Sequence, residues 1–165
     1  MHPEDTSQMD PQLVQALSHL HYGLYFLSTA TLAEPKGMLV SWVSQVGGRP
    51  PLVMAAVREN RRLLADLKEH RAFAINLLPQ GARELAGRLA RPRERRFQEI
   101  ALEQGPLNLP VLQEAVGVLC CRLLESEIKP GDHHLLVGEV AGALWRGPGP
   151  AMHQTEGGHA YLGLG

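Results

Sequence analysis

The sequence predicts a mostly β protein, an antiparallel β-barrel with added helices, formed as one domain over residues 10–165. Six segments have the apolar, β-branched or aromatic character of strands, whereas only three have helical periodicity. These helical segments are too few and badly placed for the β-α-β repeats that build parallel sheets. The chain has no internal repeat and no linker, so the elements are expected to share one core.

The chain is expected to begin with a disordered tail, residues 1–9, and a helix that ends near His21. Asp10-Pro11 indicates the helix start, because Asp caps free backbone N–H groups and Pro is tolerated at the first helical position. An apolar stripe then recurs at helical spacing, at Leu13, Val14, Leu17 and Leu20. The stripe predicts that the helix turns one face toward a core.

Three strands are expected next. Residues 22–31 are aromatic and β-branched, and residues 38–46 form a second strand. Residues 52–57 are apolar on both faces, which is typical of a buried strand. The glycines and prolines of residues 47–51 separate the second strand from the third, because both residue types interrupt strands.

A helix, a strand and a second short helix are expected over residues 60–90. Asn60 is suited to cap the first helix, whose inward-facing residues are Leu63, Leu64 and Leu67. Residues 72–78 are an apolar strand, and residues 81–90 form the short helix. Residues 91–112 are expected to be irregular because prolines interrupt them.

The C-terminal part is expected to be a hairpin over residues 117–144, with a turn at Pro130-Gly131. Tyr161 and Leu162 are expected to form a short closing strand. Cys120 and Cys121 are adjacent, and neighbours on a strand point to opposite faces. We therefore expect two reduced thiols rather than a disulfide, as in a reducing compartment.

Composition and charge exclude several classes of function. The 16 basic and 17 acidic residues give a net charge of −1, so neither nucleic acid nor a membrane surface is an expected partner. No apolar run reaches membrane-spanning length, and the N-terminus lacks the features of a secretory signal, so a cytoplasmic location is expected. Neither a Cys-x-x-Cys nor a His-Glu-x-x-His motif occurs, so no metal site is expected.

Five segments, taken in order, are similar to those of one family. They are Ala16 to Tyr25, Gly37 to Val46, Pro50 to Val53, Phe73 to Leu78, and Gly131-Asp132-His133 with the following Val137-Gly138-Glu139-Val140. On these motifs the chain resembles the flavin reductase-like domain family, which has the FMN-binding split-barrel fold. The resemblance implies a six-stranded antiparallel Greek-key barrel. It also implies a homodimer, FMN or FAD as the flavin, and flavin reduction by NAD(P)H with electrons passed to free flavin or a partner protein.

The resemblance also implies site residues. The strand expected to lie along the flavin contributes Gly37, Met38, Leu39, Val40, Ser41 and Trp42. In it, Ser41 would offer a hydroxyl, and Gly37 would allow close backbone approach. The alternative is a plain barrel strand with Met38 and Trp42 in the core.

Further polar residues are candidates for contacts to the flavin. Arg58, Asn60 or Arg61 would hold the flavin phosphate, because a helix start offers free N–H groups to an anion; the alternative is a solvated helix start capped by Asn60. His133 is the candidate catalytic residue, with a positioning role, since hydride transfer requires no protein acid; the alternative is a solvated turn histidine. Asn76 would bond flavin edge atoms or, equally, backbone groups in the core.

Two other functions remain open from the sequence. One is a non-enzymatic FMN electron carrier. The other is a split barrel without flavin, which is favoured by Leu39 and Leu63 at positions where many family members carry Thr. A basic run is either a solvated loop balanced by glutamates or a landing patch for NAD(P)H phosphates; its members are Arg88, Arg91, Arg93, Arg95 and Arg96.

Overall fold

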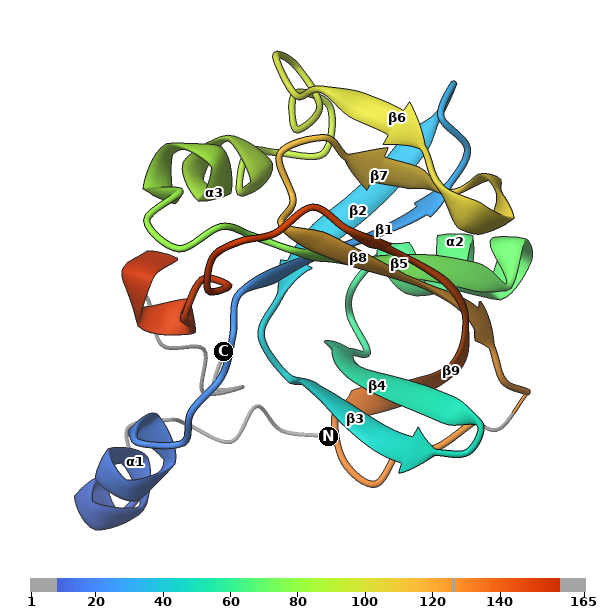
Figure 1. Cartoon of the computed structure of the whole chain (residues 1–165). Helices are drawn as coiled ribbons and strands as arrows, with labels where there is room; N and C mark the ends of the chain where they lie inside the picture. Colours follow the sequence, from blue (N-terminus) through green and yellow to red (C-terminus); the bar gives the residue numbers. More distant parts are fainter. Residues whose placement is uncertain (1–8, 126, 158–165) are drawn as a thin grey trace.

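A computed structural model describes residues 9–125 and 127–157 of the chain, and its centre is one antiparallel sheet in the order β2-β1-β5-β8-β9-β4-β3 (Figure 1). These strands are β1 (Tyr25–Ala30), β2 (Pro35–Val40), β3 (Val43–Gly48), β4 (Pro51–Arg58), β5 (Ala72–Leu77), β8 (Gly117–Leu123) and β9 (His133–Trp145). The helices are α1 (Pro11–Ser18), α2 (Leu63–His70) and α3 (Arg83–Leu89). The predicted mostly β, antiparallel fold class is confirmed.

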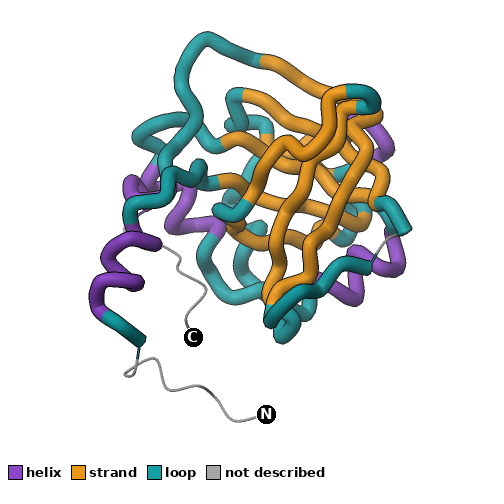
Figure 2. The backbone as a smooth tube through the Cα atoms, turned by 90° about the horizontal axis from the view of Figure 1, so that it is seen from below, coloured by secondary structure: helices purple, strands orange, loops and turns teal. Residues whose placement is uncertain are grey.

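The expected single strand over residues 38–46 is wrong, because the structure divides it into β2 and β3 at Ser41 and Trp42. β2 pairs with β1 at one edge of the sheet, and β3 pairs with β4 at the other. The chain therefore links the two edges through this break, where the N–H of Ala56 on β4 donates to the carbonyl of Trp42 at 2.9 Å. The sheet curls into a split barrel with seven strands where six were expected (Figure 2).

The central strands are buried on both faces. Phe26 and Cys120 belong to the core cluster that includes α3, whereas Leu27 and Cys121 belong to the cluster that includes α2. The two cysteines are unpaired and lie on opposite faces, as predicted. Burial raises the pKa of Cys120 to about 11 and that of Cys121 to about 12, so both thiols are neutral near pH 7.

Helix α2 turns Leu63, Leu64 and Leu67 into the core as predicted, but Asn60 is not its cap. The N-cap position is Arg62, and its side chain makes no capping hydrogen bond. The predicted short helix is present as α3, with Leu85 and Leu89 buried.

Helix α1 begins after Asp10 as predicted, and the Asp10 carboxylate accepts the N–H of Gln12 at 2.9 Å. Its apolar stripe does not face the core, since α1 has no buried residue and projects from the barrel (Figure 1). Leu13 is 46% exposed and Leu20 is 50% exposed. Periodicity shows that a helix has an apolar face, but it does not show what covers that face.

The segment 91–112 is not wholly irregular as expected. It contains β6 (Leu102–Gln104), a 3₁₀ turn η2 (Pro106–Asn108) and β7 (Pro110–Leu112), and the two strands pair into a ribbon. Most of the predicted tail and the predicted closing strand at Tyr161 and Leu162 fall on residues 1–8 and 158–165, outside the described residues. In the part of the chain that the structure describes, no helix is long and apolar enough to cross a bilayer.

Candidate functional site

An apolar pocket of about 410 Å³ opens beside the break between β2 and β3. Residues Met38 to Trp42 form one wall. Ala86 and Gly87 of α3 also line the pocket, together with Ala90, which directly follows this helix. Polar side chains at the pocket are Ser41, Arg58, Arg61, Arg83 and Gln154. The segment around the break and the small residues at α3 thus line a mostly apolar cavity that suits a flat apolar group.

The ring of Trp42 packs against the ring of His133. Their ring centroids are 4.8 Å apart with an interplanar angle of 37°. His133 is buried and its Nδ1 lies 2.6 Å from Oδ1 of Asp132, while Oδ2 of Asp132 lies 3.4 Å from Nε of Arg58. The hydrogen bond from His133 is the main cause that lowers the pKa of Asp132, and the nearby Arg58 lowers it further. The Asp132 carboxylate therefore orients Arg58 directly, and it orients Trp42 through His133.

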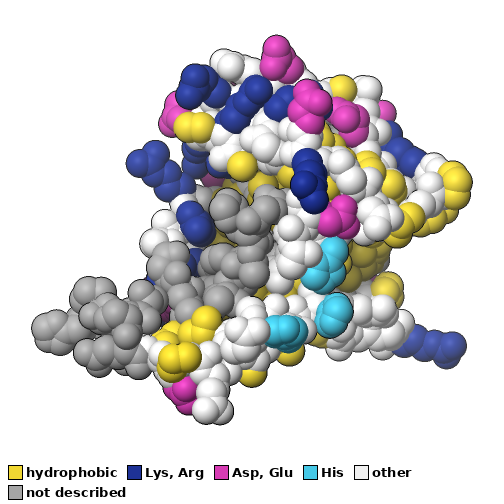
Figure 3. All heavy atoms as spheres, turned by 90° about the vertical axis from the view of Figure 1, so that its left-hand side faces the viewer, with side chains coloured by type: hydrophobic (Ala, Val, Ile, Leu, Met, Phe, Trp, Pro, Cys, Tyr) yellow, Lys and Arg dark blue, Asp and Glu magenta, His cyan; other side chains and the backbone are white. Residues whose placement is uncertain are grey.

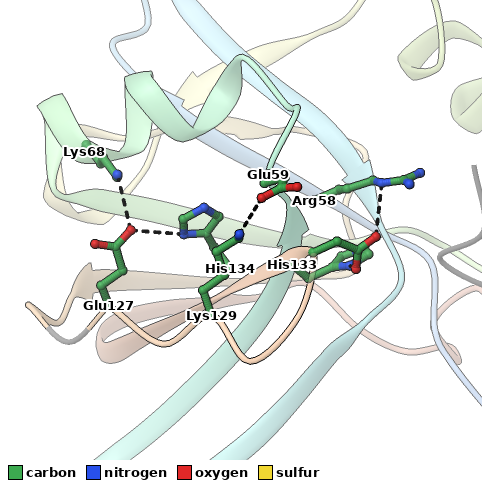
Figure 4. A network of polar contacts seen from close by, with 8 residues as sticks. Arg58, Glu59, Lys68, Glu127, Lys129, His133 and His134 are labelled. Carbon is green, nitrogen blue, oxygen red and sulfur yellow. Dashed lines mark hydrogen bonds and ion pairs between the residues drawn. The ribbon is translucent and has the colours of Figure 1, made fainter. Parts of the chain in front are cut away.

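A second set of ion pairs holds the turn before β9 in place (Figure 4). Lys129 pairs with Glu59 at 2.5 Å, and Glu127 contacts both Lys68 on α2 at 3.5 Å and His134 at 3.4 Å. Such exposed pairs each contribute about 0–1 kcal/mol. Together they tie the turn that carries Asp132 and His133 to the end of β4 and to α2.

A second pocket, of about 300 Å³, adjoins the apolar pocket and shares Met38 and Arg61 with it. Among the described residues, five cationic side chains and no carboxylate line it; the cations are Lys36, Arg61, Arg62, Arg93 and Arg96. We call it the basic pocket. It lies at the N-terminus of α2, where backbone N–H groups and the helix dipole also favour an anion. The arrangement suits a phosphate.

Two arginines of the basic pocket are held by other groups. Arg93 pairs with Asp66 of α2 at 3.0 Å. Arg96 donates to the carbonyl of Gly37 on β2 and to the carbonyl of Arg91. Burial is the main cause that lowers the pKa of Arg96, and the neighbouring charge of Arg93 lowers it further. This concentration of positive charge favours a bound anion.

The structure brings together most of the residues that the sequence analysis selected. Met38 to Trp42, Arg58 and Arg61 line the apolar pocket, whereas Gly37 and Asn60 line the basic pocket. Gly37 also has a packing role that the sequence analysis did not predict. A Cβ at this position would clash with the Phe26 ring and approach the carbonyl of Leu27 to 2.7 Å, so close packing against β1 requires the glycine.

Asn76 lies in the core and lines neither pocket. Its amide nitrogen donates to the carbonyl of Phe26 at 2.8 Å and to the hydroxyl of Ser28 at 2.9 Å. Its amide oxygen accepts the N–H of Leu112 at 2.9 Å. The side chain therefore ties β1, β5 and β7 together, and the core alternative describes it better than a flavin contact does.

Several pocket residues were not selected from the sequence as site residues, among them Arg83, Gly87, Arg96 and Gln154. Arg96 belongs to the basic run, but the sequence pattern alone does not show which arginines of that run reach a pocket. Arg88 pairs with Glu114 and Arg91 with Glu99, and basic and acidic side chains are interspersed over the upper part of the face that carries α3 (Figure 3). The solvated-loop interpretation fits those members, whereas Arg93 and Arg96 reach the basic pocket.

Comparison with known proteins agrees with this geometry. Residues 17–158 match the family described as "Flavin reductase like domain". The chain belongs to this family. It is 31% identical over 149 residues to the reductase component of 4-hydroxyphenylacetate 3-monooxygenase from Thermus thermophilus, an alignment that covers 90% of this chain and 93% of that protein.

The chain is also similar to a second curated relative and to a solved structure. The chain is 31% identical over 121 residues to "Flavin reductase (NADH)" of Kitasatospora aureofaciens, covering 72% of this chain and 61% of that longer relative. It superposes with a TM-score of 0.80 on the NADH:FAD oxidoreductase SgcE6 of Streptomyces globisporus, at 24% identity and over 95% of this chain and 92% of that one. This structural likeness shows that the split-barrel fold is shared.

Proposed function

We propose that this flavin reductase family member catalyses the NAD(P)H-dependent reduction of a flavin, FMN or FAD, held across its two pockets. One observation carries the proposal: an apolar pocket and a basic pocket adjoin and share Met38 and Arg61. A flavin nucleotide has the matching parts, a flat apolar ring system and a phosphate.

The residues present fit a flavin nucleotide. The apolar wall suits the ring system, and five cations with the α2 N-terminus suit a phosphate. A methyl group added to Gly87 of α3 would meet no atom within 4 Å, so open space faces the helix at the pocket. Leu39 and Leu63 lack the hydroxyls of many family members, but the cations of the basic pocket provide stronger, charge-assisted donors.

Bound flavin would supply the redox chemistry, because it accepts hydride from a reduced nicotinamide. The contribution of this chain is binding and orientation. Trp42 is held in place by the ring of His133, and Asp132 fixes the orientation of His133. His133 does not line the apolar pocket. We therefore assign it a positioning role through Trp42 rather than proton transfer.

The proposal extends to a homodimer, a cytoplasmic location and an electron acceptor. The exposed Leu13 and Leu20 of the α1 stripe and the 72% exposed Trp145 support self-association. Two unpaired, buried cysteines are consistent with a reducing compartment. Because the Thermus relative is named as a monooxygenase reductase component, a partner monooxygenase is one acceptor, and free flavin is the other.

The absorption spectrum of the protein tests this function. The protein is incubated with FMN or FAD, desalted, and then mixed anaerobically with NADH or NADPH. Retained flavin that bleaches supports the reductase and identifies its donor. Retained flavin that does not bleach indicates the electron carrier. If desalting removes the flavin and excess FMN gives no turnover, the function is wrong.

A further inference from the structure

Gln154 is a buried polar side chain with no hydrogen-bond partner in the described structure. It is only 2% exposed, and it lines the apolar pocket. Both its amide oxygen and its amide nitrogen are buried, and neither has a partner among the described residues. Most buried side-chain amides are hydrogen-bonded, because an unmade bond loses the solvation of the group without replacement. An unpaired donor and an unpaired acceptor at a cavity therefore require an explanation.

The backbone around Gln154 is firmly held, so its unpaired side chain does not belong to a loose segment. Gln154 begins the 3₁₀ turn η3 (Gln154–Gly157), and its N–H donates to the carbonyl of Tyr22 at 3.0 Å. Two residues earlier, the N–H of Met152 donates to the carbonyl of Leu78 at 2.7 Å. Two residues later, the carboxylate of Glu156 accepts the N–H groups of Gly81 at 2.8 Å and His153 at 3.1 Å.

We propose that Gln154 is the recognition residue of the apolar pocket and pairs with a ligand edge that carries an N–H donor beside a carbonyl acceptor. The inference rests on the proposed function and names the group that reads the ligand there. The side-chain amide matches such an edge because it offers one acceptor and one donor side by side. The pyrimidine edge of a flavin and the carboxamide of a nicotinamide both have this chemistry.

The proposal predicts effects of opposite sign on stability and on binding. Gln154→Met keeps the length of the side chain and removes both polar atoms. In the ligand-free protein these atoms have no described partner, so the melting temperature should stay the same or rise. Ligand affinity should fall about tenfold, equivalent to about 1.4 kcal/mol. A residue that only supported the fold would lower the melting temperature instead.

The experiment compares wild type, Gln154→Met and a control, Gln12→Met, which replaces an exposed glutamine on α1. Flavin fluorescence gives the Kd for FMN, steady-state kinetics at saturating FMN give the KM for NADH, and a thermal scan without ligand gives the Tm. If Gln154 pairs with the flavin, the FMN Kd rises and the NADH KM does not change. If it pairs with the nicotinamide, the KM rises and the Kd does not change.

The outcomes separate this inference from the proposed function. If wild type binds FMN and is reduced, but Gln154→Met matches it in both Kd and KM, the inference alone is overturned. The inference is also overturned if weaker binding comes with a Tm below that of Gln12→Met. If wild type neither binds flavin nor oxidises NAD(P)H with excess FMN, both the function and the inference are wrong.

Discussion

Arg96 both makes a structural contact and contributes positive charge to the basic pocket. It donates to the carbonyl of Gly37, which positions the side chain beside β2, and it also lines the basic pocket. Partial burial and the neighbouring charge of Arg93 both lower its pKa. A bound phosphate would relieve that repulsion. The effect of Arg96 on ligand affinity should therefore depend on whether the ligand carries a phosphate.

Arg96→Ala should raise the Kd for FMN about tenfold or more, because a charge-assisted hydrogen bond is worth about 1.5–3 kcal/mol. It should change the Kd for riboflavin, which has no phosphate, less than twofold. Fluorescence titration measures both constants. Arg95→Ala is the matched control, since Arg95 is exposed and does not line the basic pocket. An equal loss for FMN and riboflavin would contradict the phosphate assignment.

At the level of the element, α3 presents a glycine to the apolar pocket. Gly87 lies inside the helix, where glycine destabilises by about 0.5–1 kcal/mol relative to alanine. A Cβ there would meet no protein atom within 4 Å. Packing within the described structure therefore does not require the glycine, whereas a ligand that occupies the pocket would.

Gly87→Ala should stabilise the ligand-free protein by about 0.5–1 kcal/mol and weaken flavin binding. Urea denaturation measures the first effect and an FMN titration the second. Gly48→Ala on β3 is the control, because a Cβ there also meets no atom within 4 Å but lies outside both pockets. Tighter or unchanged FMN binding by Gly87→Ala would show that the ligand does not reach α3.

The segment that carries Gln154 should respond to acid through Glu156. Two backbone hydrogen bonds, from His153 first and then from Gly81, are the main causes that lower the pKa of Glu156. A lowered folded-state pKa means that the carboxylate stabilises the fold above its unfolded pKa, about 4.3, and loses this contribution as the pH falls through the folded-state pKa.

Glu156→Gln should therefore have a lower Tm than wild type at pH 7, and the difference should shrink as the pH falls below about 4.3. Thermal scans between pH 3 and pH 7 test this expectation. Glu139→Gln, which replaces an exposed carboxylate on β9, controls for the loss of a surface charge. A Tm difference that does not vary with pH would rule out the ionised carboxylate as the stabilising group.

At the scale of the whole molecule, the apolar stripe of α1 is the surface that points to a partner. The stripe is not covered by the barrel, and the helix projects from it (Figure 1). In the proposed homodimer, a second copy covers this face. Helix α1 would then be stabilised by packing on the partner rather than by its own propensity, which is weak for a helix of this length.

Sedimentation equilibrium should give the mass of two chains for the wild type. Leu13→Glu should shift the equilibrium toward one chain, since it places a charge in the apolar stripe. Gln12→Glu adds a charge on the same helix outside the stripe and should leave the dimer intact. A wild-type mass of one chain, or equal dissociation of both variants, would contradict a dimer through α1.

The sequence predicted those features that depend on neighbouring residues. Alternation and apolar runs identified β1, β4, β5, β8 and β9, but they merged β2 and β3 into one strand and missed the short ribbon strands. Leucine spacing identified α2 and α3 with their buried faces. Five segments in order identified the family, and one of them, Gly37 to Val46, contains the pocket residues Met38 to Trp42. The expected helix start pointed to Arg58 and Arg61, which also line the apolar pocket.

Only the tertiary structure decided how these pieces meet. The alternation of apolar and polar residues does not reveal the break at Ser41 and Trp42, because the break arises where the chain passes from one edge of the sheet to the other. Asn76 and Gln154 are both buried amides. One is fully bonded in the core and the other is unpaired at the pocket. The sequence by itself determined the fold class, most strands, the helices and the family. Hydrogen-bond partners far apart in the chain decided the role of each polar residue, because those partners exist only after folding.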